Sequence, residues 1–407
     1  MAVFNFCGKI ALGKETDKFK PIERNTYDPS RWMKTSVKFN CVSDTNRVMC
    51  TAQAGKNEDD SKNSVRTFTK SVKDENGNVT KGTLIEIPWN KRFDADQIEK
   101  VAGFRKFVVD TGDTRMRYKL QNLVEAFENG TDTSKLIEET GVTTLADAKA
   151  ALEKSKAKKK EFLSQWDFVE HLIKVCQSDK FKDKKFYISG TYDVQYNPVN
   201  DKFYTSYSPN RVILAPDDAE LSTKMEMDFF FGEGAFDDSV YEETGKCFIN
   251  GWISYYDSNK EIKKTGFKPV TITVREDDEK KLKVLKRKFD IEEGIKQIGL
   301  TLKVVEGAER KEITMDDLDE ETREDIECGL VDFDEVVKAL GGNVFGDRIS
   351  ELRFVKLMDN KNKAEDTTYE LSDMCPARKE TVDVEEIIHE VFDEDLPFSL
   401  DDDDDLL

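Results

Sequence analysis

The sequence predicts an α+β fold that is rich in β-strands, with small barrels, helical insertions and a disordered acidic C-terminal tail. Three observations lead to this prediction. Short segments that alternate apolar and polar residues occur near the N-terminus and again after residue 181. A block with apolar residues at helical spacing lies between them. The segment 390–407 carries nine acidic side chains and no basic one, so it is expected to stay solvated.

Shifts in composition divide the chain into successive parts. With 407 residues, of which 38% are hydrophobic, the chain is long enough for two or three domains with cores of their own. We expect an N-terminal β-domain at residues 1–115, a helical insertion at 116–180, a second β-rich domain with short helices at 181–358, a linker at 359–389 and a partner-docking tail at 390–407.

The N-terminal β-domain is expected to contain several strands. Residues 32–42 alternate apolar and polar side chains, which is typical of a half-buried strand, and residues 47–54 are expected to pair with them. Residues 64–72 and 79–88 flank Asn76-Gly77, a dipeptide that favours a hairpin turn. Short strands with long polar loops suit a small OB-like barrel. A flattened sandwich is the alternative.

Aromatic and basic residues stand beside each other along this domain. Rings that stack on bases and cations that contact phosphates hold single-stranded nucleic acid in this way, so these residues are candidates for that role. Phe39 is expected in the core instead, and surface and structural roles are equally open for Trp32 and Trp89. The candidates are Arg31, Trp32, Lys38, Arg66, Phe68, Trp89, Lys91, Arg92 and Phe93.

The middle of the chain is expected to be helical. Residues 118–129 and 162–176 place apolar side chains on one face, and residues 144–160 are rich in Ala and Lys. The lysines at 154–160 fit an exposed helix end better than a phosphate-binding patch, because cations there complement the helix dipole. His171 lies off the apolar stripe and is expected to be a surface or hydrogen-bonded residue rather than a metal ligand.

The second β-rich domain opens with expected strands at residues 186–196 and 203–214, and Gly190 predicts a β-bulge in the first of them. An apolar strand with a glycine, followed by a bend and an aromatic-rich strand, resembles the opening of OB-fold single-stranded DNA-binding proteins. Tyrosine stacks well on bases, although it is also a good strand former. The candidates for stacking and phosphate contact are Lys184, Lys185, Tyr192, Tyr196, Lys202, Tyr204, Tyr207 and Arg211.

The rest of this domain combines strands with strongly charged segments. Residues 280–288 are basic, and two short acidic helices are expected within residues 316–340. Further strands are expected at residues 225–231, 246–256, 269–274 and 345–358.

No catalytic constellation is recognisable, so we expect a protein that is not an enzyme and has no cofactor. The motifs GxxxxGK[ST], GxGxxG and HExxH are absent, and the chain has only two histidines. Its seven cysteines are scattered without a CxxC pair, which favours reduced thiols in the cytoplasm over a structural zinc site. No secretion leader is recognisable and no run of about 18 apolar residues occurs, so we expect a cytoplasmic protein without membrane contact.

The acidic tail carries the most specific resemblance. Residues 393–398, DEDLPF, resemble the acidic tip ending in Pro-Phe of bacterial single-stranded DNA-binding proteins, which docks into replication and repair partners. Here nine residues follow Phe398, so the terminal pair Leu406-Leu407 is a second candidate for the docking role. The resemblance therefore implies partner binding by Asp395, Leu396, Pro397, Phe398, Leu406 and Leu407.

The net charge of −20 would disfavour nucleic-acid binding, but removing the tail's acids leaves −11 for residues 1–389, and local charge matters more than the sum. The chain is similar to phage-encoded OB-fold single-stranded DNA-binding proteins with an acidic C-terminal tail. That resemblance implies a protein of phage or bacterial DNA replication, recombination or repair, which coats single-stranded DNA while its tail recruits replication or recombination proteins and competes with DNA. The alternative is a phage assembly or scaffold protein, and a magnesium-dependent nuclease is a third, weaker reading.

Overall fold

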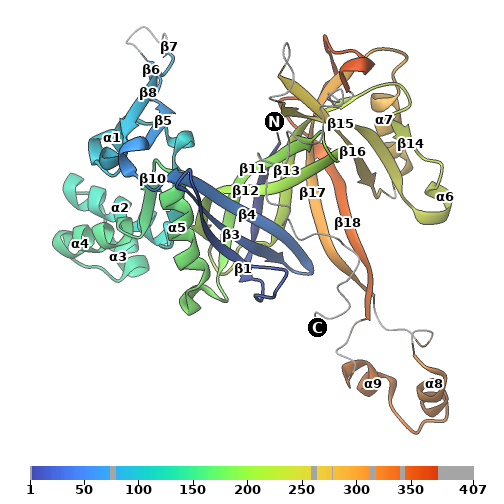
Figure 1. The fold of residues 1–407 in the computed structure, drawn as a ribbon. Coiled ribbons are helices and arrows are strands. Elements are labelled where there is room, and N and C mark those ends of the chain that lie inside the picture. The colour runs from blue at the N-terminus through green and yellow to red at the C-terminus, as the bar shows by residue number, and fades with distance from the viewer. Residues whose placement is uncertain are drawn as a thin grey trace.

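The computed structural model describes residues 2–73, 79–257, 264–276, 278–311, 315, 318–339 and 344–374. Within them the chain is α+β and rich in strands, as predicted (Figure 1). The acidic tail, with Asp395, Leu396, Pro397, Phe398, Leu406 and Leu407, lies outside the described residues, as does the predicted linker from residue 375 onward. None of the described helices combines the length and the apolar character that crossing a bilayer requires.

Most of the described strands belong to one 15-stranded sheet. Its strands are β1 (Val3–Leu12), β2 (Ile22–Tyr27), β3 (Trp32–Ser43), β4 (Asn46–Asn57), β9 (Phe107–Asp110), β10 (Lys159–Phe162), β11 (Lys185–Asn197), β12 (Lys202–Leu214), β13 (Ser222–Phe231), β14 (Phe236–Asp237), β15 (Cys247–Tyr256), β16 (Thr265–Val274), β17 (Lys296–Lys311), β18 (Val344–Leu357) and β19 (Glu365–Asp366). Neighbours follow the order β10-β9-β12-β4-β3-β1-β13-β15-β16-β18-β17-β19, and β2, β11 and β14 pair beside this path.

This sheet is not a closed barrel, which corrects the prediction of two separate OB-like barrels. The reason lies in β1. Its residues 3–7 pair with both β11 and β13, and its residues 9–12 pair with β3. Along β1, Phe4 and Phe6 are buried in the main core, which fixes this register. The first strand of the chain therefore joins the two β-rich regions into one continuous sheet.

The β11–β12 hairpin confirms two predictions. It pairs residues 186–197 with residues 202–214 in antiparallel register, close to the predicted strand bounds. The register shifts between Ser189 and Gly190, which is the predicted irregularity. A Cβ atom at Gly190 would overlap with the carbonyl oxygen of Ser208, so the close approach of β12 requires glycine there.

Helices lie mainly at the edges of the sheet. They are α1 (Ala95–Lys100), α2 (Thr114–Asn129), α3 (Ser134–Thr140), α4 (Leu145–Lys156), α5 (Gln165–Cys176), α6 (Tyr241–Thr244), α7 (Glu279–Phe289), α8 (Glu320–Glu327) and α9 (Phe333–Ala339). Helix α5 packs on β3, β4 and β9 with Phe168 and Leu172 fully buried. Helices α2, α3 and α4 share a small core of their own, as the predicted helical insertion requires.

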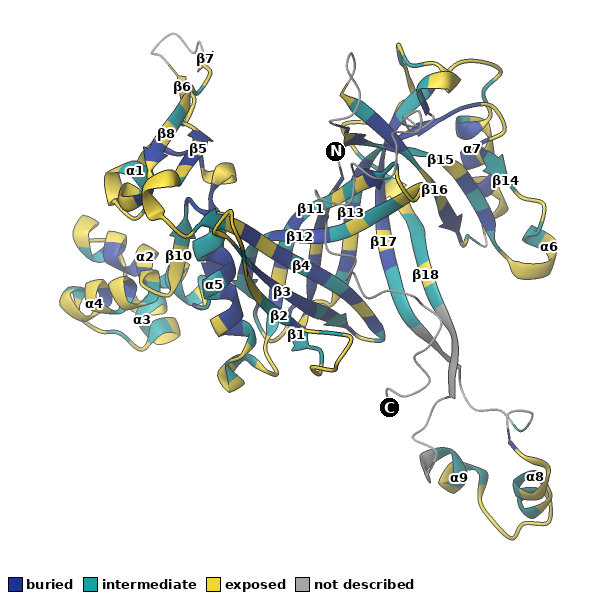
Figure 2. Cartoon of the chain, viewed as in Figure 1, coloured by how far each residue is buried: buried dark blue, intermediate teal, exposed yellow. Residues whose placement is uncertain are grey.

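A hairpin stands clear of the main sheet at one end of the molecule (Figure 1). Strand β5 (Ser64–Phe68) pairs with β8 (Leu84–Pro88), and β6 (Val72–Lys73) pairs with β7 (Val79–Thr80), which confirms the hairpin predicted there. The Asn76-Gly77 turn itself lies outside the described residues. We call residues 64–106 the arm. Figure 2 shows its dark buried positions on the side toward the body, where Val65, Ile87, Trp89, Val101 and Leu163 form a small core.

The β17–β18 hairpin extends from the opposite side of the sheet, and α8 and α9 lie beyond its far end (Figure 1). Strand β18 and these two helices confirm the predictions for residues 345–358 and 316–340. Strand β17 was not predicted. Its sequence does carry a two-residue period, because the buried Ile298, Leu300, Leu302 and Val304 alternate with Gly299, Thr301 and Lys303. The strand pairs with both β13 and β18.

Candidate nucleic-acid interface

One face of the arm combines exposed aromatic rings with exposed cations. Because side chains alternate along a strand, β5 buries Val65 and Thr67 and exposes Arg66 and Phe68. The Phe68 side chain is 40% exposed, which is unusual for a large apolar ring on a paired strand. Leu84 lies opposite Phe68 on β8 and is 63% exposed, so a small apolar patch faces solvent here.

An arginine is held between two phenylalanine rings on this face. The Arg105 guanidinium carbon lies 5.1 Å from the centre of the Phe68 ring and 5.3 Å from that of Phe104. Phe104 is 72% exposed. Arg105 is exposed and makes no ion pair with a described residue. Sequence reasoning missed Phe104 and Arg105, although Phe104-Arg105-Lys106 is one more aromatic–basic neighbourhood of the kind that selected the other candidates.

Two lysines continue the positive charge beside Phe68. The bridge between Thr69 and Val101 places Lys70 opposite Lys100, and the Lys70 amide donates to the Lys100 carbonyl at 2.9 Å. Both side chains are exposed, and neither has an ion pair with a described residue. Like charges opposite each other on paired strands destabilise the pair, and a phosphate between them would remove that cost. Arg66 is partly neutralised, because its Nε lies 3.6 Å from Glu86 Oε2.

The predicted Trp89–Phe93 cluster divides into a buried part and an exposed part. Trp89 is only 7% exposed and belongs to the arm's core, which argues against its role as a stacking platform. Arg92 stacks on Trp89 and Phe93 at 4.0 and 4.2 Å, and its Nε donates to Asp167 Oδ2 at 2.7 Å. Arg92 therefore ties the arm to α5. Phe93, at 56% exposure, and Lys91 remain available at the surface.

The candidates on β3 and directly before it are mostly engaged within the protein. Lys38 is buried and its ammonium lies 3.0 Å from Glu23, so it cannot reach a phosphate in this structure. Arg31 is exposed but donates from Nε to Glu58 Oε2 at 2.7 Å. Trp32 is 46% exposed and its indole lies against Gly55, where a Cβ would be only 2.5 Å from Cζ2.

The tyrosines of the β11–β12 hairpin do not form an open stacking surface. Tyr207 and Tyr196 are 6% and 5% exposed, and Tyr207 contacts the rings of Phe4, Phe6 and Tyr192. Burial raises the pKa of Tyr207 well above its ordinary value. Tyr207 belongs to the main core, and Tyr196 is buried against the ring of Phe203.

Apart from Lys202, the remaining candidates in and next to this hairpin are half-buried or already paired. The half-buried Tyr192 accepts a hydrogen bond from Lys268 at 3.4 Å, and Tyr204 accepts one from Asn200 at 2.7 Å. Three of the four basic candidates have partners within the protein. Lys184 pairs with Asp217, Lys185 donates to the carbonyls of Asp217 and Ala219, and Arg211 donates to the Gly103 carbonyl. Lys202 is exposed.

The described residues hold no group of three or more His, Cys, Asp or Glu that could bind a metal ion. Burial raises the pKa values of the Cys41 and Cys176 thiols to about 12, so neither is poised as a nucleophile. Burial, together with Lys174 and Lys160, lowers the pKa of His171.

Comparison of this chain with models of protein families gave no match, and comparison with curated proteins found no sequence relative. Function is therefore inferred from the side chains of this protein and their arrangement.

Proposed function

We propose that the protein binds single-stranded DNA on the exposed face of the arm. The observation that carries this proposal is Arg105, exposed between Phe68 and Phe104 and without a carboxylate partner among the described residues. Exposed apolar side chains that gather in one patch often mark a binding site. A strand of nucleic acid presents both flat bases and phosphates, so it satisfies the rings and the cations together.

In this proposal, bases stack on Phe68 and Phe104 while Arg105, Lys70 and Lys100 contact phosphates. Each stacked base contributes about 1–3 kcal/mol, and every base offers a flat face, so sequence preference is slight. The arm suits this role despite the protein's net charge of −20, because residues 64–106 carry nine basic and six acidic side chains. Lys91 and Phe93 on the arm are exposed, as is Trp32, and they would extend the contact.

The acidic segment 390–407 completes the proposal. Its carboxylates resemble a run of phosphates in charge, so it would compete with DNA for the arm, and its apolar residues would dock replication or recombination proteins. The setting is the cytoplasm, with phage or bacterial DNA replication, recombination or repair as the process. Deleting residues 390–407 should raise the affinity for single-stranded DNA at low salt, and an unchanged or weaker affinity would contradict the competition.

The experiment that tests the proposal is a titration of fluorescently labelled oligo-dT with the full-length chain at several salt concentrations, beside a duplex of the same length. We expect tighter binding to the single strand and a linear fall of log affinity with log salt concentration. Equal affinity for the duplex, or an affinity that does not depend on salt, would contradict it.

A further inference from the structure

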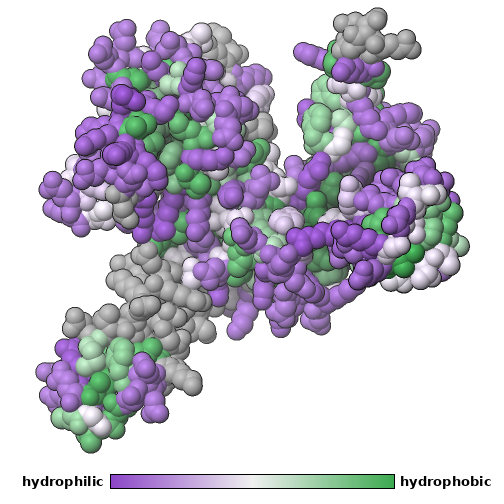
Figure 3. Space-filling view, turned by 180° about the vertical axis from the view of Figure 1, so that it is seen from behind, coloured by the Kyte–Doolittle hydropathy of each residue, from purple (hydrophilic) through white to green (hydrophobic). Residues whose placement is uncertain are grey.

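A pocket of about 310 Å³ lies on the lobe formed by β15 and β16. Figure 3 shows this lobe separated by a gap from the arm. Its floor includes two cross-strand pairs, Trp252 with Pro269 and Asn250 with Thr271, which are separated by the pair of Gly251 and Val270. Its wall is the loop of residues 232–235. A volume of this size is at the lower end for small-molecule sites and fits one planar ring system rather than a longer ligand.

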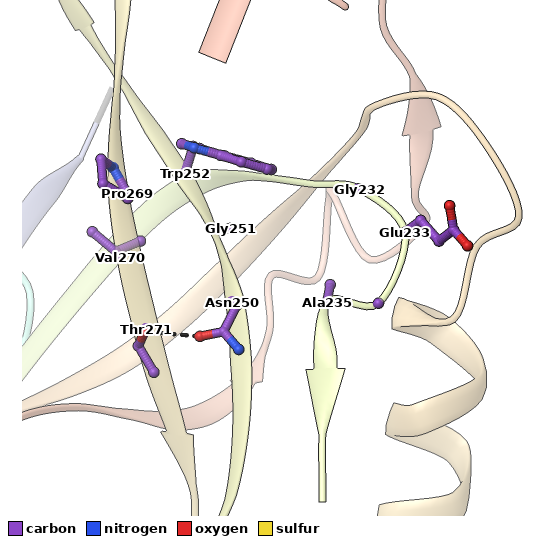
Figure 4. Close-up of a pocket in the computed structure, with 10 residues that line it drawn as sticks. Gly232, Glu233, Ala235, Asn250, Gly251, Trp252, Pro269, Val270 and Thr271 are labelled. Atoms are coloured by element: carbon purple, nitrogen blue, oxygen red, sulfur yellow. Dashed lines mark hydrogen bonds between the residues drawn. The ribbon is translucent and has the colours of Figure 1, made fainter. Parts of the chain in front are cut away.

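Trp252 provides a fixed, flat surface. It is half-buried, because it packs against the cluster of Phe230 and Ile295 while also lining the pocket. In Figure 4 the indole is seen edge-on, and Asn250 and Thr271 lie on one side of its plane. Gly232 stands at the edge of the ring, since a Cβ there would lie 4.0 Å from Cζ3 of Trp252.

Asn250 supplies a hydrogen-bond donor with a fixed orientation. Its Oδ1 accepts a hydrogen bond from the Thr271 hydroxyl at 2.8 Å, which orients the amide group. Its Nδ2 makes no hydrogen bond with a described residue, and in Figure 4 it points to the side where Ala235 lies. An amide NH2 donates to carbonyl oxygens and ring nitrogens, and every nucleobase carries at least one of these acceptors.

The charge near the pocket is compatible with a ligand that is neutral or carries a phosphate outside it. Among the residues that the structure describes, Glu233 is the one acidic residue that lines the pocket, and its side chain points away from Trp252 and Asn250 in Figure 4. The floor is therefore a neutral aromatic ring with a polar donor beside it. This is the combination that reads a flat base by stacking and one hydrogen bond.

We propose that this pocket is a second base-binding site, in which one nucleobase stacks on Trp252 and accepts a hydrogen bond from Asn250 Nδ2. The inference rests on the proposed binding of single-stranded DNA, and it adds a contact on a lobe separate from the arm. A strand long enough to reach both lobes would be held at two places.

The test is photo-cross-linking of the full-length chain to oligo-dT that carries one 5-iododeoxyuridine at successive positions, with the cross-linked peptides identified by mass spectrometry. We expect cross-links at Trp252 in addition to those on the arm. Trp252→Ala should weaken binding of long oligo-dT by about 5- to 150-fold, the range that one lost stacking contact covers. The matched control is Tyr256→Ala, which removes a 69% exposed ring from the same strand outside the pocket and should leave binding unchanged.

Binding to oligo-dT with cross-links on the arm alone would overturn this inference and leave the proposed function standing. Absence of any binding to single-stranded DNA would overturn both. The cross-link needs no substitution, so the test stays decisive even if Trp252→Ala folds poorly through loss of its packing on Phe230.

Discussion

The arm and the β11–β12 hairpin use the same residue types for opposite purposes. Both are hairpins with aromatic and basic side chains close together in the sequence. On the arm, Phe68 and Phe104 are 40% and 72% exposed, whereas on the β11–β12 hairpin Tyr196 and Tyr207 are 5% and 6% exposed. The difference follows from the partners of each hairpin. The arm has one face covered by its small core, and β11–β12 lies inside the large sheet.

This comparison shows that aromatic density alone does not identify a stacking surface. A ring that the sheet buries stabilises the fold, and a ring that it leaves exposed is available to a ligand. Substitutions in the two hairpins should therefore separate stability from binding.

The largest effect is expected from Tyr207→Ala. This change removes a buried ring that contacts Phe4, Phe6 and Tyr192, so the free energy of unfolding should fall by about 3–5 kcal/mol. Denaturant unfolding measures it. The control is Tyr187→Ala on the neighbouring strand, whose side chain is 44% exposed and whose loss should change stability by about 0.5 kcal/mol or less. A similar small effect at both positions would mean that Tyr207 is not a core residue.

A smaller effect, on binding, is expected from the double substitution Lys70→Ala and Lys100→Ala. Removing two phosphate contacts should lower the slope of log affinity against log salt concentration by about 1.4 for a single strand. Stability should rise by about 0.2–1 kcal/mol, because the two like charges no longer face each other. Anisotropy titrations and denaturant unfolding measure the two quantities, and a loss of stability would contradict the placement of these lysines.

The smallest effect concerns the attachment of the arm to the sheet. Lys106 directly follows the arm's last helical turn, and it donates a hydrogen bond to Glu161 on β10 at 2.8 Å. Burial acts to raise the pKa of Glu161, but the hydrogen bonds from Lys106 and Lys159 outweigh it and hold the pKa below its ordinary value of 4.5.

Because the pKa of Glu161 is lower in the folded chain, the unfolded chain protonates this carboxylate more readily. The ionised Glu161 therefore stabilises the fold above pH 4.5, and this stabilisation is lost as the pH falls through the pKa of the folded state. Unfolding midpoints measured between pH 6 and pH 3 should therefore fall less steeply in Glu161→Gln than in the wild type. Identical profiles would contradict this role of the ion pair.

Much of the local structure was predictable from the sequence. The strand at residues 32–42, the helical stripe in residues 118–129 and the bulge at Gly190 all depend on neighbouring residues, and the structure confirms them. The strand is not half-buried as predicted, because the polar Ser36 and Lys38 are buried as well. The single open sheet was not predictable, because it depends on β1 finding β11 and β13 more than 170 residues away. Periodicity within a strand carries no information about such distant partners.

The candidate site was predictable only in part. Phe68 and Phe93 were selected by their basic neighbours and are exposed. Trp89 was selected by the same rule, and Tyr196 and Tyr207 were selected because tyrosine stacks well on bases. All three are buried, because neither residue type nor neighbours in the sequence show which side chains pack inward. Phe104 was missed, since it lies in a short turn of helix without a strand pattern around it.

The central claim is that the exposed face of the arm holds single-stranded DNA, and one paired measurement tests it most directly. Fluorescence anisotropy of labelled oligo-dT should be measured with the wild type, with Phe68→Ala and with Tyr118→Ala, which removes a 67% exposed ring from α2. We predict that Phe68→Ala loses about 1–3 kcal/mol of binding free energy and that Tyr118→Ala binds as the wild type does. Equal affinities for all three proteins would contradict the claim.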